Sequence, residues 1–184
     1  MHPDEMVVEQ VLRGEREKFR ILVERYQRQI YRFLRGMGLE HDDAADVMQS
    51  AFVRAYDKLS SLKGGDRFRV WLYSIAANQA RNYLRSRSRL QPLNDLDFPA
   101  AEEIPDIPLE RERLREMIDG SLARLPEEQR RVVLLRIFED LPFKDVATVC
   151  GISLSSAKVT YHRALKTMQR WLKPAVSRLD LNNP

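Results

Sequence analysis

Residues 91–110 divide this 184-residue chain into two parts. They hold four of the nine prolines, and positions 94–110 carry six acidic residues and no basic residue. Because prolines remove backbone hydrogen-bond donors and like charges repel one another, we expect a flexible, extended linker here rather than a packed element. The chain is therefore predicted to form two small domains, residues 1–90 and 111–177, on either side of this linker.

Apolar residues recur at steps of three and four on both sides of the linker, which is typical of amphipathic helices. The first part is predicted to form four helices, at about residues 3–14, 15–35, 42–59 and 68–89. After the linker, helical spacing resumes near Leu109, and Pro126 starts a further helix with two acidic residues in its first turn. No segment alternates apolar and polar residues long enough to indicate a strand, so the predicted fold class is all-α.

The composition excludes several classes of protein. One cysteine, Cys150, rules out an internal disulfide and fits a reducing cytoplasm, and three scattered histidines leave no zinc-binding set. No carboxylate pair, His/Cys set or Gly-rich phosphate loop has catalytic spacing, so we expect neither an enzyme nor a cofactor. The longest apolar runs have four residues, far below the ~20 needed to span a bilayer, and no export leader opens the chain.

Three aspartates, Asp42, Asp43 and Asp46, raise the alternative of a metal site at the start of the third helix. Asp42 and Asp43 would point to different sides of a helix, which does not suit shared metal ligation. We expect instead that they cap the helix and complement its dipole. No metal site is therefore predicted.

Residues 143–172 are predicted to form a short helix, a tight turn and a longer helix, the pattern of a helix-turn-helix. Ala147 permits close helix approach, Gly151 can take the left-handed turn conformation, and Ser153 can cap the second helix. Basic residues share one face of that helix, and no acidic residue occurs between Asp145 and Asp180. An amphipathic core helix with a solvated basic face is the alternative, but the turn and the basic face together favour DNA binding.

In such a unit the start of the second helix enters the major groove. The residues predicted to reach base edges there are Ser155, Ser156, Lys158, Val159, Thr160 and His162. Arg163 and Lys166 lie further along, where contacts with phosphates are expected.

The fourth predicted helix, residues 68–89, contains no acidic residue and carries one unusual stripe. An aromatic ring, amides and guanidiniums suit unpaired bases, because rings and guanidiniums stack, amides read base edges, and arginines hold the backbone. The alternative is that Trp71 belongs to the core and the arginines serve solubility. The residues predicted to bind a single strand are Trp71, Asn78, Arg81, Asn82, Arg85 and Arg89.

Three sequence segments, which form one block before the linker and one after it, resemble the bacterial sigma factors of the extracytoplasmic-function group. DAADVMQSAFVRAYDKL and RFRVWLYSIAANQARNYL precede the linker, and LPEEQRRVVLLRIFEDLPFKDVATVCGIS follows it, in the order that this family shows. The resemblance implies a transcription initiation factor that directs core RNA polymerase to promoters in the cytoplasm. It implies further contacts with the clamp helices of the largest polymerase subunit and with the flap, and an anti-sigma protein as a partner.

The resemblance also assigns roles to the helices. The one from Phe68 is similar to the helix that melts the minus-ten element, with Asn78 at a base-reading position, and the one from Leu154 is similar to the reader of the minus-thirty-five element. Val159 and Thr160 depart from the Ser-Arg pair frequent in the family, and Ser50 stands where the family usually has an acidic residue. The polymerase-binding positions implied on the third helix are Asp46, Gln49, Ser50 and Val53.

A stand-alone helix-turn-helix regulator is the competing interpretation. Such a protein would bind duplex DNA tightly by itself, usually as a dimer on a palindrome. It gives no reason for the aromatic, amide and arginine stripe before the linker.

Overall fold

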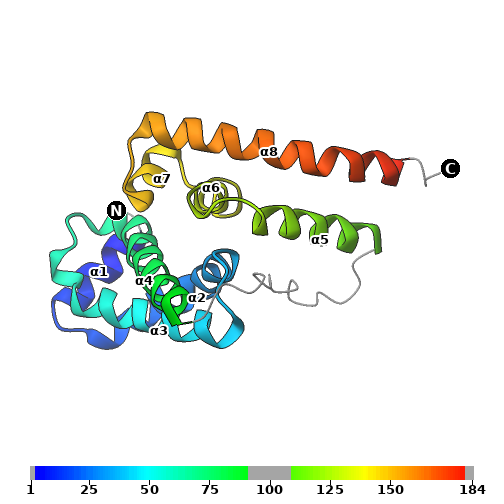
Figure 1. Ribbon diagram of the computed structural model, residues 1–184. Coiled ribbons are helices and arrows are strands. Elements are labelled where there is room, and N and C mark those ends of the chain that lie inside the picture. The colour runs from blue at the N-terminus through cyan, green and yellow to red at the C-terminus, as the bar shows by residue number, and fades with distance from the viewer. Residues whose placement is uncertain (1–2, 91–108, 181–184) are drawn as a thin grey trace.

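The computed structural model describes residues 3–90 and 109–180, and every regular element in these two ranges is a helix. Figure 1 shows two helical groups, one before and one after the undescribed segment. The predicted all-α fold is thus confirmed, while the linker itself lies outside the described residues. None of the helices described is long and apolar enough to cross a membrane.

The first group comprises α1 (Pro3–Leu12), α2 (Phe19–Gly36), α3 (His41–Asp57) and α4 (Phe68–Leu90). Single 3-10 turns occupy Arg16–Lys18, Leu59–Ser61 and Gly65–Arg67.

An aromatic cluster fixes the start of α4. Phe68, its first residue, is fully buried. The ring centroids of Phe19, Tyr26 and Trp71 lie 6.3, 5.9 and 6.1 Å from that of Phe68. Aromatic pairs at these separations add to the stabilisation from area burial. The cluster joins α2 to α4 and so sets the direction in which α4 leaves the core.

A buried carboxylate ties α1 to α2. Asp4 is fully buried and accepts hydrogen bonds from the Arg25 guanidinium and the Tyr26 hydroxyl. Burial, together with this hydrogen bond, raises the pKa of Tyr26 well above its usual range. Because a buried charge is tolerated only when it is paired, the short α1 is held firmly to the rest of the domain.

The start of α3 differs from the prediction. The helix begins at His41, after Glu40, and no side chain caps it, so the expected cap by Asp42 or Asp43 is wrong. Both aspartates lie in the first turn, where they still complement the helix dipole. Asp43 instead accepts a hydrogen bond from Arg87 of α4 at 2.8 Å, a partner that lies 44 residues away in the sequence. Within the described ranges no cluster of three potential metal ligands occurs.

The second group comprises α5 (Leu109–Ala123), α6 (Glu127–Val133), a π-helical turn (Leu134–Phe138), α7 (Phe143–Cys150) and α8 (Leu154–Asp180). As expected, α6 begins directly after Pro126. The π-helical turn was not predicted, because wider turns of this kind follow from packing rather than from periodicity. Cys150 is buried at the end of α7.

The turn between α7 and α8 has the predicted chemistry. Gly151 adopts the left-handed conformation, with φ 68° and ψ 35°. The backbone nitrogen of Ser156 donates to Ser153 Oγ at 3.0 Å, which satisfies a donor that the first turn of α8 would leave unpaired. This local geometry confirms the helix-turn-helix.

We expect Gly151→Ala to lower the free energy of unfolding by about 1–2 kcal/mol, because a Cβ is disfavoured at positive φ. No heavy atom lies within 4 Å of the added Cβ, so the cost is purely conformational. Gly120→Ala, in α5 and also in open space, is the matched control and should raise stability by about 0.5–1 kcal/mol. Urea unfolding of both variants checks this, and equal effects of one sign would contradict it.

The two groups also contact each other, which the sequence did not indicate. In Figure 1, α7 lies beside α4, and these two helices are in contact. The π-helical turn contacts α2, where a Cβ added to Gly36 would lie 2.7 Å from Leu134 Cδ2. The structure therefore holds both groups in one closed arrangement.

Candidate nucleic-acid interfaces

The predicted single-strand stripe lies on the surface of α4. Asn78, Asn82 and Arg85 are exposed, whereas Arg81 is half-buried. Arg81 Nη1 donates to Asn78 Oδ1 at 3.3 Å, and Arg85 Nη2 donates to Asn82 Oδ1 at 2.7 Å. Each amide is thus oriented by a guanidinium one turn away. This lowers the conformational entropy that the amide side chain would lose on binding a base.

Trp71 combines the two alternatives considered for it. The ring is half-buried and packs against Phe68, so part of it belongs to the core. Three apolar residues of α4, Phe68, Leu72 and Ala76, are fully buried beside the stripe. The side chain of Arg89, predicted to contact the single strand, is outside the part of the chain that the structure describes.

Two further arginines of the acid-free segment have structural partners. Arg87 donates to Glu40 at 2.6 Å and to Asp43 at 2.8 Å, which joins α4 to the start of α3. Asp43 also raises the pKa of Tyr83 to about 12, chiefly through a side-chain hydrogen bond. Arg69 pairs with a residue beyond the linker. The lack of acids in α4 therefore reflects partners supplied by other helices as well as an open basic face.

The helix-turn-helix presents a second polar surface at the start of α8. Ala157, Ala164 and Met168 bury one side of the helix. Ser153 Oγ, besides capping α8, lies 3.0 Å from Ser155 Oγ and 2.8 Å from Ser156 Oγ. Of the predicted groove residues Thr160 is half-buried, and those exposed are Ser155, Ser156, Lys158, Val159, His162, Arg163 and Lys166.

One exposed side of α3 carries the implied polymerase-binding positions. Asp46, Gln49, Ser50 and Val53 are all exposed, at steps of three, one and three residues. Val53 is an apolar side chain with 55% of its surface exposed, the highest fraction among the large apolar residues that the structure describes as exposed. An apolar centre among polar neighbours is typical of protein interfaces.

A hollow of about 390 Å³ lies between α5 and α8. It is lined by Met117, Trp171 and Leu172 with small residues of α5, and the Arg124 guanidinium lies 5.6 Å from the centroid of the Trp171 ring.

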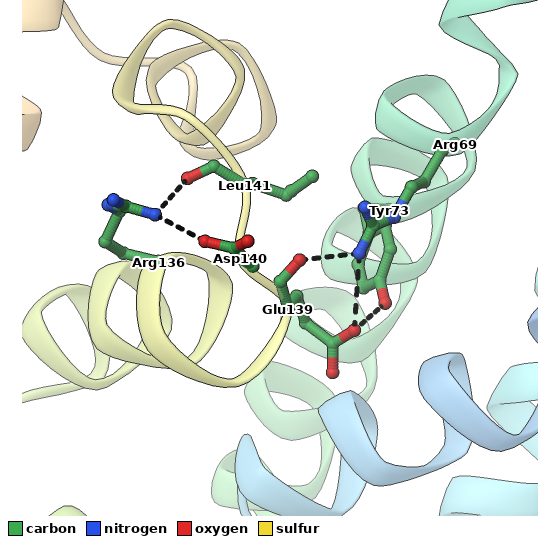
Figure 2. Close-up of polar contacts among 6 residues, drawn as sticks. All are labelled: Arg69, Tyr73, Arg136, Glu139, Asp140 and Leu141. Atoms are coloured by element: carbon green, nitrogen blue, oxygen red, sulfur yellow. Dashed lines mark hydrogen bonds and ion pairs between the residues drawn. The ribbon is translucent and has the colours of Figure 1, made fainter.

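Sequence reasoning missed one polar cluster altogether. Arg69 and Tyr73 of α4 meet Glu139, which follows the π-helical turn (Figure 2). These partners are 66 and 70 residues apart, and no periodicity or spacing could reveal the pairing.

Comparison with known proteins gives the family to which both helical groups belong. The Sigma-70 region 2 family matches residues 22–90, and the Sigma-70 region 4 family matches residues 115–168. The RNA polymerase sigma-H factor of Pseudomonas aeruginosa is 32% identical over 93% of this chain and 94% of its own length. The ECF RNA polymerase sigma-E factor of Escherichia coli is 30% identical over 95% of this chain and 97% of its own length. The chain belongs to the extracytoplasmic-function sigma factors.

This sigma factor is accordingly a transcription initiation factor that directs core RNA polymerase to promoters, and the stand-alone regulator is not favoured. At the level of the family, sigma factors are non-catalytic. The stripe lies within region 2 and the start of α8 within region 4.

Solved structures share the fold. CnrH in complex with the cytosolic domain of CnrY is 24% identical, with a TM-score of 0.71 over 93% of this chain and 97% of that one. The sigma factor RpoE of Bartonella quintana, in complex with the anti-sigma factor NepR, is 21% identical, with a TM-score of 0.72 over 85% and 98%.

Proposed function

We propose a division of labour between the two domains of this sigma factor. Region 2 melts the minus-ten element and holds the separated strand on Trp71, Asn78, Asn82 and their neighbouring arginines. Region 4 reads the duplex of the minus-thirty-five element with the start of α8. The observation that carries this proposal is the simultaneous exposure of two chemically different surfaces, an aromatic and amide stripe on α4 and a basic, serine-capped helix start on α8.

Region 2 docks on the polymerase through α3. Asp46 and Gln49 occupy the contact positions for the clamp helices of the largest subunit, and Val53 supplies an apolar centre with 55% of its surface exposed. The hollow between α5 and α8 offers a second binding site, for an apolar part of the polymerase flap. Two such attachments fix both domains on one large partner.

The free factor should bind duplex promoter DNA weakly, because neither domain alone buries a standard specific interface. The promoter elements lie about two DNA turns apart, roughly 70 Å at ~35 Å per turn. Polymerase sets the two domains at that separation and converts two weak sites into one bivalent site.

Reconstitution tests the proposal. Purified factor, core polymerase and genomic fragments should give transcripts with defined start points, while core polymerase alone should give none. Permanganate reactivity of unpaired thymines then reports whether the minus-ten element has opened. Tight binding of unmelted DNA by the free factor, without association with core polymerase, would contradict the division of labour.

Lys166→Ala should weaken promoter binding by the holoenzyme to a similar degree for every sequence. Because Lys166 is expected to neutralise a phosphate, the slope of log K against log salt should become shallower by about 0.9. Arg113→Ala, an exposed cation on α5 of the same domain, is the control and should leave the slope unchanged. A loss confined to one promoter sequence would assign Lys166 to base reading instead.

An anti-sigma protein is a further proposed partner, and the cytoplasm is the proposed compartment, because core polymerase and promoter DNA are found there. CnrH is seen in complex with the cytosolic domain of CnrY, and the Bartonella factor with the anti-sigma factor NepR. Co-purification of the native factor from cells, followed by identification of the bound chain, tests for such a partner.

A further inference from the structure

Regions 2 and 4 meet through a buried polar contact, formed by Arg69, Tyr73 and Glu139 and here named the Glu139 contact (Figure 2). The Tyr73 hydroxyl donates to the Glu139 carboxylate, and Arg69 Nη2 donates to the Glu139 carbonyl oxygen at 2.5 Å. The same guanidinium lies 3.9 Å from the carboxylate. Tyr73 is fully buried, and Glu139 is 4% exposed.

The side chain of Glu139 has its hydrogen-bond partner in the other domain. Burial raises the pKa of Glu139, while the Tyr73 hydrogen bond and the charges of Arg32 and Arg69 lower it. All three of these groups belong to region 2. Closure of the two domains therefore removes the Glu139 carboxylate from water. The Tyr73 hydrogen bond and the nearby arginines offset the free-energy cost of this desolvation.

The surfaces around the Glu139 contact fit each other. Ala77 and Ala80 follow Tyr73 on the same side of α4, are fully buried, and permit close approach. Leu134 lies over Gly36 at the end of α2. Arg81, which belongs to the predicted single-strand site, lies 4.0 Å from Glu127 of α6. In the closed form the Arg81 guanidinium, which is predicted to hold the DNA backbone, thus lies near a carboxylate of region 4.

In the closed form the two DNA-binding surfaces lie too close together to contact both promoter elements at once. α7 has eight residues and contacts α4, and three residues join it to α8. Given helical rise, chain reach and helix packing distances, the start of α8 lies within ~35–40 Å of the α4 axis. The promoter elements are roughly 70 Å apart. The closed form leaves Asn78 and Asn82 exposed, but it cannot reach both elements together.

We infer that the Glu139 contact is an autoinhibitory contact, which holds the free sigma factor closed and must separate before both promoter elements can be engaged. This inference rests on the proposed division of labour between regions 2 and 4. It assigns regulation to the chain itself, in addition to any partner protein.

One buried donor at the contact lacks an acceptor. Within the described part of the chain, Nε of Arg69 is buried and has no hydrogen-bond partner. This donor regains a hydrogen bond to water on opening, which reduces the free-energy difference that favours the closed state.

A reversible cross-link tests the inference directly. A Cβ at position 36 would lie 3.5 Å from Leu134 Cγ, so Gly36→Cys with Leu134→Cys brings two Cβ atoms close to the ~3.5–4.5 Å of a disulfide. Cys150→Ala in the same chain removes the native thiol. We expect the disulfide to form on mild oxidation, the oxidised factor to lose promoter-directed transcription at least tenfold, and reduction to restore it. The single-cysteine variants should respond to neither treatment.

Failure of the disulfide to form, or equal activity of the oxidised and reduced factor, would overturn the inference. Inactivity of the wild-type factor with core polymerase would overturn the proposed function, and the inference with it. Glu139→Ala supplies an independent measurement that requires no cross-link. It should increase the radius of gyration of the free factor in small-angle scattering and lower the concentration for half-maximal transcription several-fold. No change in either quantity would also overturn the inference.

Discussion

Replacing Asn78 and Asn82 together with alanine is expected to reduce promoter opening by about 100-fold while leaving core polymerase binding intact. Each amide that reads a base contributes about 1–3 kcal/mol of discrimination, and two losses near 1.4 kcal/mol each multiply to this factor. Both side chains are exposed, and within the described residues each bonds to an arginine on its own helix, so their removal leaves the core unchanged. Alanine also favours the helix more than asparagine does.

Permanganate reactivity at the minus-ten element measures the opening, and co-migration with core polymerase measures the docking. Ser86→Ala is the matched control: Ser86 is exposed on α4, lies beside the stripe, and donates to the carbonyl oxygen of Tyr83 on the same helix. It should behave as the wild type. Should the double variant lose core binding to the same extent as opening, the separation of these two tasks within region 2 would be wrong.

Val53→Glu is expected to produce the opposite phenotype, with affinity for core polymerase reduced by roughly 30- to 150-fold, from about 2–3 kcal/mol. The substitution places an unpaired carboxylate at the centre of the proposed α3 interface, where docking would remove it from water. Because Val53 is 55% exposed in the free factor, the change should leave stability nearly unaltered.

Fluorescence anisotropy of labelled factor against core polymerase gives the affinity. Ile21→Glu, an exposed apolar residue of α2 in the same domain, is the control and should bind normally. Comparable losses in both variants would indicate a general effect of added negative charge rather than an α3 interface.

Features fixed by neighbours in sequence could be predicted. Gly151 and Ser153 act within one turn, and α6 begins directly after Pro126, as its position predicted. Asn78 and Asn82, placed by sequence on one stripe of the fourth helix, are both exposed on α4. The roles of individual site residues stay predictions, because exposure makes a residue available without showing what it binds.

Features set by distant partners could not be predicted. Arg87 was one of several arginines on a basic helix, yet it bonds to carboxylates 44 and 47 residues away. That pairing also removes Asp43 from the capping role expected of it. The Glu139 contact joins residues 66 and 70 positions apart across the linker, and its charges carry no local pattern.

The π-helical turn at Leu134–Phe138 ends directly before Glu139. A wider turn of this kind accommodates one extra residue in an otherwise continuous helix. Its first residue, Leu134, lies against Gly36, and the residue that follows it, Glu139, meets Tyr73, so one short segment supplies both of these contacts with region 2. Substitutions confined to this segment would therefore loosen the closed form while every residue that reads the promoter stays unchanged.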